Sequence, residues 1–452
     1  MKSVVKNNRT FIICMIIWCF ITLLRLFAHQ PWFDESYDWL LAEKLSVVQL
    51  FEHLHIEGHT FVWFFLIMPF AKLNLFFPYS MYLINWLFCF FAIIILWKKA
   101  PFNNFLKILI TFSFPFLTYY PIVARCYSIG IFLLFVLTAM FSEKTKHPII
   151  YAWLIFICAN TSVIATIGAF CFAIFLFYEL IKQNKFKEFV HCSVVGLLFC
   201  ILFYLQLFPI NRVTLFDETM MGLNMDFFTN FCIFPPVINL FLLCIFLVSF
   251  TYFLIKDKKI LLFLFIIYTL LLCLFHFCYF GSFWHWYFFY IYLIIAVWLG
   301  FNDIYLKSFS KRMITVLLCV LSFCFVLEYR INPYVYQSDS KIIANSMIKH
   351  KFCRVILFNN AFIASLPYLH NKNVEIYHYT NHLRGIKIKF EDVKKSLSKE
   401  KENYGYFYSD NCDEIQNLRN GMENIKFIFD EKIKNKVCVY KIVYNNSENV
   451  EK

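Results

Sequence analysis

Two adjacent carboxylates, Asp34 and Glu35, follow directly after the first long apolar stretch of the chain. Ionisable groups are costly to hold at a membrane boundary, so such residues commonly mark function. A positioned carboxylate can take the proton from an attacking hydroxyl group, which is general base catalysis. We therefore expect Asp34 to act as a base and Glu35 to orient it or to bind an acceptor. The structural alternative for Asp34 is a helix N-cap, in which its side chain accepts a hydrogen bond from a free backbone N–H group.

Three further residues are suited to binding an anion. Arg125 is the only Lys or Arg between Lys107 and Lys144, and a guanidinium group presents a rigid fork of donors that matches phosphate. His59 and His285 could donate hydrogen bonds to the same group. The alternatives are an interfacial arginine with its stem along apolar surface and, around His285, an ordinary belt of interfacial aromatic residues.

The segment 52–59 holds three His and two Glu, which are ligand types that divalent metals accept. The spacing of His55 and His59 would suit one face of a helix, but Gly58 disfavours a helix there. Clusters of this kind in loops are commonly solvated. We therefore expect no cofactor, with a divalent metal as the alternative.

Membrane helices are the elements that must position these residues. Of 452 residues, 61% are hydrophobic, and the mean hydropathy is +0.63. Apolar runs near the length that crosses a hydrocarbon layer of about 30 Å extend from residue 11 to residue 329, and the first lacks a signal-peptide cleavage site. The predicted spans are 11–28, 79–97, 104–120, 126–141, 148–159, 162–181, 188–208, 231–255, 260–280, 284–302 and 313–329.

The stretch 60–77 decides the topology. Its clean apolar run is short and ends near Pro69 and Lys72, which favours a re-entrant or surface-lying segment. If it does not span, most lysine-rich loops fall on the inner side with the N-terminus, as the positive-inside tendency requires. The predicted fold is thus an all-α polytopic membrane protein of about 11 transmembrane helices. Its outer loop, 29–78, is expected to hold an amphipathic surface helix over 36–50.

Residues 331–452 have the composition of a soluble domain. Helix-like and strand-like segments alternate there, which predicts a small α/β domain after a membrane domain of residues 1–330. An odd number of spans places it on the outer side. The predicted helices are 339–350, 390–398 and 413–422, and the predicted strands are 355–358, 374–377, 404–408, 425–429 and 437–443.

Net charge and cysteine content exclude some partners and cofactors. A net charge of +13 would also suit nucleic acid, but the basic residues lie in short loops between spans, where they set orientation. We expect contacts with membrane lipids and none with nucleic acid. Cys353, Cys412 and Cys438 of the tail are odd in number and have no CxxC spacing, so they imply neither a zinc site nor a full set of disulfides.

Taken together, these residues resemble the GT-C superfamily of integral-membrane glycosyltransferases, especially the family 39-like branch of protein O-mannosyltransferases and the lipid A aminoarabinose transferase. The acidic pair is similar to the motif in that family's first outer loop. Three further segments are similar to its Lys/His-Pro-Pro-Leu segment, its Ala-Arg-Ser-Tyr-like motif and its Arg-His pair before a late span; they are 57–69, 124–128 and 284–285. Thr60-Phe61 replaces the Pro-Pro, and no Arg precedes His285.

The resemblance implies transfer of a sugar from a polyprenyl-phosphate donor to a hydroxyl group of a lipid, glycan or protein. The reaction would invert the anomeric centre at the extracytoplasmic face of a bacterial plasma membrane, with Asp34 as base. Donor phosphate ligands would be Arg125, His59 and His285, and accessory or acceptor contacts would be Glu57 and Tyr127.

The alternative is a lipid or polysaccharide transporter or flippase, which would share the many spans. Transporters often contain paired inverted halves, whereas this sequence has no internal repeat at a fixed period. Its candidate polar residues also gather at one face of the membrane instead of at mid-span. We therefore favour the transferase.

Overall fold

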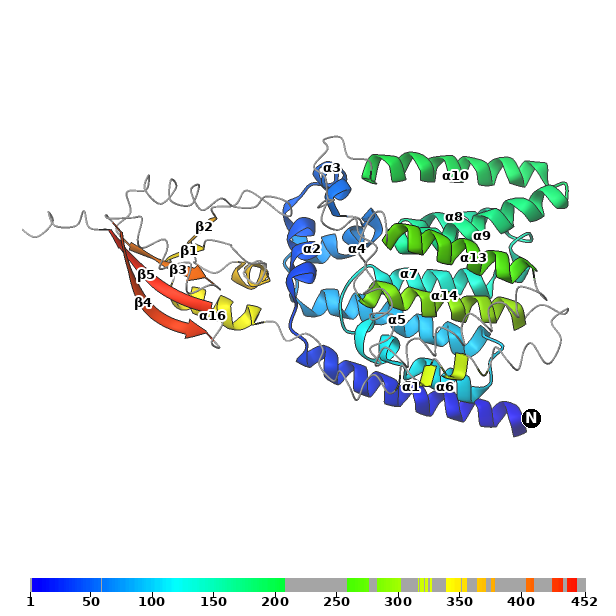
Figure 1. Ribbon diagram of the computed structural model, residues 1–452, viewed down its shortest axis with the longest axis horizontal. Coiled ribbons are helices and arrows are strands. Elements are labelled where there is room, and N and C mark those ends of the chain that lie inside the picture. Colours follow the sequence, from blue (N-terminus) through cyan, green and yellow to red (C-terminus); the bar gives the residue numbers. More distant parts are fainter. Residues whose placement is uncertain are drawn as a thin grey trace, which may run out of the picture. The chain divides into compact units, whose positions relative to one another are not determined.

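The computed structural model describes residues 2–57, 59–207, 258–275 and 283–301, short pieces between 316 and 326, and 339–350, 352–355, 364–370, 375–378, 404–409, 425–433 and 437–444 (Figure 1). The chain divides into two compact units. The first unit comprises residues 1–28, 45–67 and 79–335, and the second comprises 29–44, 68–78 and 336–452. Each unit is described by itself.

The longer helices of the first unit run roughly along one direction (Figure 1), and shorter helices complete the unit. They are α1 (Lys2–Ala28), α3 (Val47–Glu57), α5 (Tyr79–Lys99), α6 (Asn104–Thr111), the π-helix η1 (Pro115–Tyr119), α7 (Tyr127–Ala139), η2 (Phe141–Glu143), α8 (Pro148–Ala159), α9 (Val163–Lys182), α10 (Phe186–Leu207), α13 (Lys258–Cys273) and α14 (Phe283–Phe301). The boundary between the units falls within α4 (Phe61–Lys72).

The described chain is mostly helical, as predicted, and several helices are long enough to span a membrane. Four of them qualify by length and composition: residues 9–28 of α1, and α5, α9 and α10. Five shorter apolar helices, α4, α7, α8, α13 and α14, accompany them. The predicted span 231–255 and most of 313–329 lie outside the described residues.

A close approach between α9 and α14 shows how tightly the helices pack. The Tyr292 hydroxyl donates to the carbonyl of Ile164 at 2.7 Å and accepts from the backbone N–H of Gly168 at 3.1 Å. A Cβ atom on Gly168 would lie 2.5 Å from Cε1 of Tyr292. Only glycine leaves room for the tyrosine ring at this position.

The predicted span 104–120 is interrupted in the structure. Helix α6 ends at Thr111, and the π-helix η1 follows after a short turn. Pro115 at the start of η1 lacks an N–H group and cannot continue an α-helical hydrogen-bond ladder. The N–H of Tyr120 instead donates to the carbonyl of Pro115 at 2.9 Å, five residues back, and such wide turns are frequent at functional sites.

The second unit contains α2 (Phe33–Lys44), α16 (Ser340–His350), the 3₁₀ helix η5 (Leu366–Leu369) and a five-stranded sheet. The strands are β1 (Phe352–Val355), β2 (Glu375–His378), β3 (Tyr404–Ser409), β4 (Ile425–Ile433) and β5 (Val437–Tyr444), in the order β2-β1-β3-β5-β4. Strand β1 is parallel to β2 and β3, whereas β5 is antiparallel to β3 and β4. Helix α16 and η5 contribute to a small core with Tyr408 and Val439.

The described part of the tail contains one of the three predicted helices and five strands. Helix α16 and strands β2, β3, β4 and β5 occur close to their predicted positions. Strand β1 includes Val355 of the predicted strand 355–358, and residues 356–358 lie outside the described residues. The predicted helices 390–398 and 413–422 lie outside the described residues. Cys438 is buried and disulfide-bonded, which the cysteine count did not predict.

The single surface helix predicted for 36–50 is wrong in two respects. Helix α2 ends at Lys44 and α3 begins at Val47, because Ser46 forms a capping box with Gln49: the Gln49 N–H donates to Ser46 Oγ at 3.3 Å, and the Ser46 N–H donates to Gln49 Oε1 at 3.0 Å. In addition, α2 is buried on all sides from Glu35 to Ala42. It therefore has no single apolar face that could lie on a bilayer.

Candidate functional site

Four residues singled out in the sequence form one contiguous cluster in the first unit. His59 lies between α3 and α4, Arg125 lies two residues before the start of α7, Tyr127 begins α7, and His285 lies in the first turn of α14. Arg125 Nη2 is 2.7 Å from His59 Nε2, and the Tyr127 hydroxyl is 2.6 Å from His285 Nε2. The rings of His59 and Tyr127 pack edge to face, with their centroids 5.8 Å apart. The two hydrogen-bonded pairs are therefore linked.

Hydrogen bonding sets the tautomer of both imidazoles. A guanidinium group only donates, so Nε2 of His59 accepts from Arg125 and the ring proton lies on Nδ1, which is 3.6 Å from Cys126 Sγ. The indole N–H of Trp284 also only donates, and it lies 3.2 Å from Nε2 of His285. Both rings are thus neutral in this arrangement, and Arg125 carries the charge of the cluster.

Burial strengthens the hydrogen bonds that this charge can make. The exposed fraction is 3% for Arg125 and 5% for His285. In a poorly hydrated environment, hydrogen bonds from a charged donor are stronger than in water. A guanidinium group with imidazole N–H groups beside it suits a phosphate or a carboxylate.

Tyr120 fixes the relative positions of three helices around the cluster. Its carbonyl accepts from Asn85 Nδ2 of α5 at 2.8 Å and from Ser128 Oγ of α7 at 2.7 Å. Its hydroxyl donates to the carbonyl of Trp284 in α14 at 3.1 Å, and the neighbouring ring of Tyr119 stacks on Trp284. The register of His285 against the start of α7 therefore depends on this residue.

Arg25 is a polar residue that the sequence reasoning missed. It lies in the last turn of α1, and its Nη1 donates to Thr118 Oγ1 of η1 at 2.6 Å. A signal was present, because Arg25 is the only Lys or Arg in the first apolar run, 11–28. Ionisable residues within such runs are functional candidates by default.

The acidic motif belongs to the second unit. Helix α2 begins at Phe33, so Asp34 lies in its first turn, half-buried, and is not its N-cap. Glu35 is fully buried; its Oε2 accepts from the backbone N–H of Trp32 at 3.1 Å and lies 2.9 Å from His29 Nε2. Glu35 thus reaches back to the residue before the helix, as the acid of a capping box does. The capping role considered for Asp34 belongs to Glu35.

Residues of the C-terminal tail hold this acidic helix in place. Ser36 Oγ donates to the carbonyl of Ala364 at 3.1 Å, and Ser340 Oγ donates to the carbonyl of Pro31 at 3.3 Å. At the other end of α2, the Glu43 carboxylate lies 2.6 Å from Nδ1 of His370. The tail is therefore part of the scaffold that positions Asp34.

Three of the residues considered as metal ligands, His53, Glu57 and His59, make other contacts. Helix α3 ends at Glu57, so His59 is not on a helical face with His55. Glu57 is buried and its Oε1 lies 3.1 Å from Nε2 of His53, one turn earlier in α3. Among the described residues, no group of three His, Cys, Asp or Glu side chains could hold a metal ion; the side chain of His55 lies outside them.

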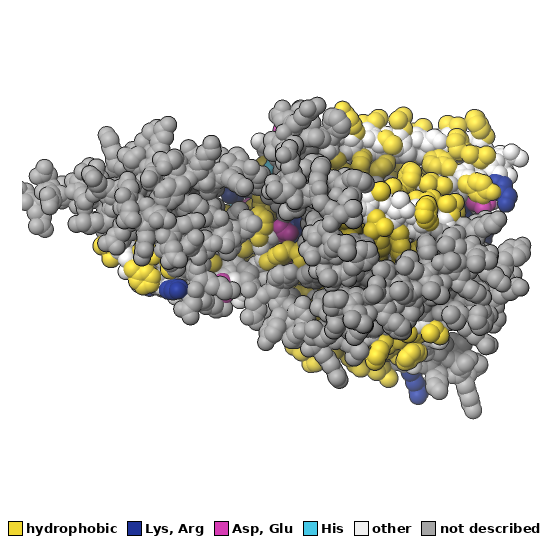
Figure 2. Space-filling model, viewed as in Figure 1, with side chains coloured by type: hydrophobic (Ala, Val, Ile, Leu, Met, Phe, Trp, Pro, Cys, Tyr) yellow, Lys and Arg dark blue, Asp and Glu magenta, His cyan; other side chains and the backbone are white. Residues whose placement is uncertain are grey.

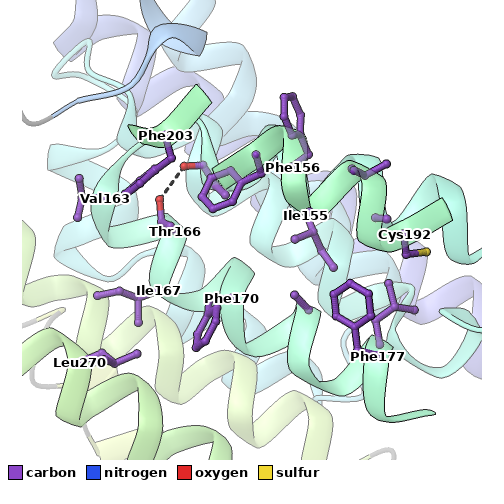
Figure 3. Close-up of a pocket in the computed structure, with 17 residues that line it drawn as sticks. Ile155, Phe156, Val163, Thr166, Ile167, Phe170, Phe177, Cys192, Phe203 and Leu270 are labelled. Carbon is purple, nitrogen blue, oxygen red and sulfur yellow. Dashed lines mark hydrogen bonds between the residues drawn. The ribbon is translucent and has the colours of Figure 1, made fainter. Parts of the chain in front are cut away.

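An apolar cavity of about 340 Å³ lies among α8, α9 and α10, with Leu270 of α13 at one side (Figure 3). The hydroxyl of Thr166, one of its few polar lining residues, lies 2.6 Å from the carbonyl of Ala159 at the end of α8 and 2.9 Å from that of Ser162 before α9. The thiol of Cys192, another lining residue, donates a hydrogen bond to the carbonyl of Pro148 at 3.5 Å. The cavity therefore offers a ligand hydrocarbon surface, which suits an alkyl or isoprenoid chain.

The outer face of α10 is also apolar. Figure 2 shows hydrophobic side chains over this part of the first unit. Those of α10 that are exposed include Val190, Val194, Leu197, Leu198, Ile201 and Leu205. An exposed apolar surface of this extent is expected of a helix that faces lipid.

The predicted site residues are thus distributed over both units. His59, Arg125, Tyr127 and His285 are brought together in the first unit, where Glu57 also lies, and Asp34 and Glu35 are neighbours in the second. The chain matches no protein-family model, no curated protein and no solved structure.

Proposed function

We propose that the protein is a membrane glycosyltransferase of GT-C type that moves a sugar from a polyprenyl-phosphate donor to a hydroxyl group of an acceptor. The observation that carries the proposal is the buried cluster of Arg125, His59, Tyr127 and His285. Its donors suit the phosphate of such a lipid, and it lies in a unit of apolar helices. The fold proposed with it has about 11 transmembrane helices.

The reaction needs one base and a stabilised leaving group. Asp34 takes the proton of the acceptor hydroxyl while the acceptor oxygen bonds to the anomeric carbon. The bond from that carbon to the phosphate oxygen breaks, its electron pair stays on the phosphate, and the anomeric centre inverts. Arg125 and the imidazoles stabilise the charge that develops on the departing phosphate. Phosphate is a competent leaving group, so no general acid is required.

The position of Asp34 in its helix supports its role as the base. The first turn of a helix favours negative charge because backbone N–H groups point toward it. Glu35 is engaged at the backbone of Trp32 and at His29, which suits a residue that fixes the helix start. The half-buried Asp34 remains the better candidate for contact with substrate.

The apolar cavity among α8, α9 and α10 supports a lipid-linked donor. Its volume of about 340 Å³ falls within the range of small-molecule pockets. Because its polar lining groups are already hydrogen-bonded, it suits a section of the polyprenyl chain. Acceptors would be hydroxyl groups of a lipid, glycan or protein.

The disulfide of Cys438 supports an extracytoplasmic location for the second unit. Disulfides form and persist in oxidising compartments and are rare in the cytosol, and Cys438 is disulfide-bonded. This agrees with the topology proposed from the lysine-rich loops. The reaction would accordingly take place at the outer face of a plasma membrane.

A transfer assay with purified full-length protein in nanodiscs tests the proposal. The probes are undecaprenyl-phosphate-linked sugars, and the readout is release of undecaprenyl phosphate. Asp34→Asn should lower the rate by about 10²–10⁴-fold, the usual contribution of a general base. The matched control is Glu52→Gln, an exposed carboxylate of α3, which should retain the wild-type rate. Undiminished release by Asp34→Asn would reject Asp34 as base, and sugar movement across the bilayer without release would favour a transporter.

A further inference from the structure

Two buried amide side chains join three helices beside the cluster. Gln206 in the last turn of α10 and Asn160, directly after α8, are both fully buried. Gln206 Nε2 donates to Asn160 Oδ1 at 3.1 Å, and Gln206 Oε1 accepts from the backbone N–H of Phe61 at 2.9 Å. The carbonyl of Asn160 accepts from the N–H of Val62 at 3.3 Å. We call this arrangement the amide clamp.

The amide clamp replaces the local cap of α4. The first N–H groups of a helix have no partner within the helix, and a Thr in the preceding position commonly serves one of them. Thr60 occupies that position, yet within the described part of the chain its hydroxyl has no hydrogen-bond partner. Phe61 and Val62 donate to residues of α10 and α8 instead. The start of α4 is therefore fixed by tertiary contacts.

His59 lies two residues before the clamped N–H of Phe61 and two residues after the end of α3 at Glu57. Because this segment is so short, the position of His59 depends on where α4 begins. We propose that Gln206 and Asn160 are positioning residues that hold His59 Nε2 against the guanidinium group of Arg125. Burying amides among apolar helices is costly unless every group is hydrogen-bonded, and here the bonds lead to the backbone next to His59. For the identity of the ligand, this inference rests on the proposed function.

The reactivity of His59 toward diethylpyrocarbonate tests the inference without any assay of transfer. The reagent modifies neutral imidazole nitrogen, and Arg125 covers Nε2 of His59. In full-length protein in nanodiscs, Gln206→Met keeps the side-chain volume but removes the hydrogen bonds to Phe61. We expect its His59 to react roughly tenfold faster, as loss of one buried hydrogen bond implies, measured by mass spectrometry. His191, exposed on the same helix, serves as internal reference and should react at the wild-type rate.

Two further variants separate positioning from general destabilisation. Ser193→Ala removes a hydrogen bond that stays within α10, from Ser193 Oγ to the carbonyl of Phe189, and should leave His59 reacting at the wild-type rate. Gln206→Glu keeps an acceptor for the N–H of Phe61 but cannot donate to Asn160, so its His59 should react at an intermediate rate. If Gln206→Met does not fold, Gln206→Glu decides the question.

Transfer kinetics then test whether the amide clamp affects binding of the donor through His59. Gln206→Met should raise the KM for undecaprenyl-phosphate-linked sugar with little change in kcat, and should add nothing when His59 is already Ala. Wild-type reactivity of His59 in a folded Gln206 variant would overturn the inference. If the wild-type protein transfers no sugar while His59 reactivity follows the clamp, the proposed function fails and the positioning role stands.

Discussion

The guanidinium group of Arg125 lies 2.7 Å from Nε2 of His59, so a permanent cation donates to a neutral imidazole in a largely buried setting. A histidine in this position orients the arginine without adding charge. Tyr127 and His285 repeat the arrangement beside them, with an O–H donor and an imidazole acceptor 2.6 Å apart. Four side chains from three separate segments thus form two linked pairs, and the guanidinium group among them suits an oxyanion.

Glu35 is expected to matter for the stability of the second unit more than for chemistry. Glu35→Gln keeps an acceptor for the N–H of Trp32 and should unfold near the wild-type temperature. Glu35→Ala leaves that N–H and His29 without this carboxylate, and should lower the free energy of unfolding by about 1–2 kcal/mol. Thermal unfolding in detergent measures the stability of both variants. Sugar transfer lost in Glu35→Gln at unchanged stability would instead assign Glu35 to the reaction.

Gly168 and Gly196 form a matched pair for testing helix packing. Gly168→Ala places a Cβ atom 2.5 Å from the Tyr292 ring and should destabilise the protein by about 1–3 kcal/mol through overpacking. At Gly196 the nearest atom to an added Cβ is Cζ of Phe177 at 3.9 Å. Gly196→Ala should therefore be neutral or stabilise α10 by about 1 kcal/mol. Equal melting temperatures for the two variants would contradict the packing of α9 against α14.

The oxidation state of Cys438 reports the compartment of the second unit. In cells quenched with acid, differential alkylation and mass spectrometry should find Cys438 protected until a reductant is added, because it is disulfide-bonded. Cys89, buried and free in α5, should be alkylated without reductant once the protein is denatured. A free thiol at Cys438 in quenched cells would place the second unit in a reducing compartment.

Local sequence signals accounted for part of this structure. Helix α8 occupies its predicted residues, and four strands of the tail lie close to theirs. The sequence also contains a signal for the break between α2 and α3, since Ser46 and Gln49 have the spacing of a capping box. We missed it because apolar residues continue at helical spacing across the break. Pro115 is a second such signal, because a proline has no N–H group to continue the α-helical hydrogen bonds after α6.

Contacts distant in sequence could not be predicted. Gln206 and Phe61 are 145 residues apart, and Ser36 and Ala364 are 328 residues apart. No local pattern shows that a glutamine of α10 caps α4, or that the tail holds the acidic helix. The residue types at His59, Arg125 and His285 suggested an anion site, but only the packing of α4, α7 and α14 shows that these side chains meet.

Binding of undecaprenyl phosphate to the purified protein tests the central claim most directly, because it asks whether Arg125 holds the phosphate. Arg125→Gln should weaken binding about 10- to 100-fold, the effect of removing charge-assisted hydrogen bonds. Lys182→Gln, an exposed cation at the end of α9, should bind as the wild type does, and so should Asp34→Asn, which removes the base but no phosphate ligand. Equal affinity of Arg125→Gln and the wild type would contradict the account.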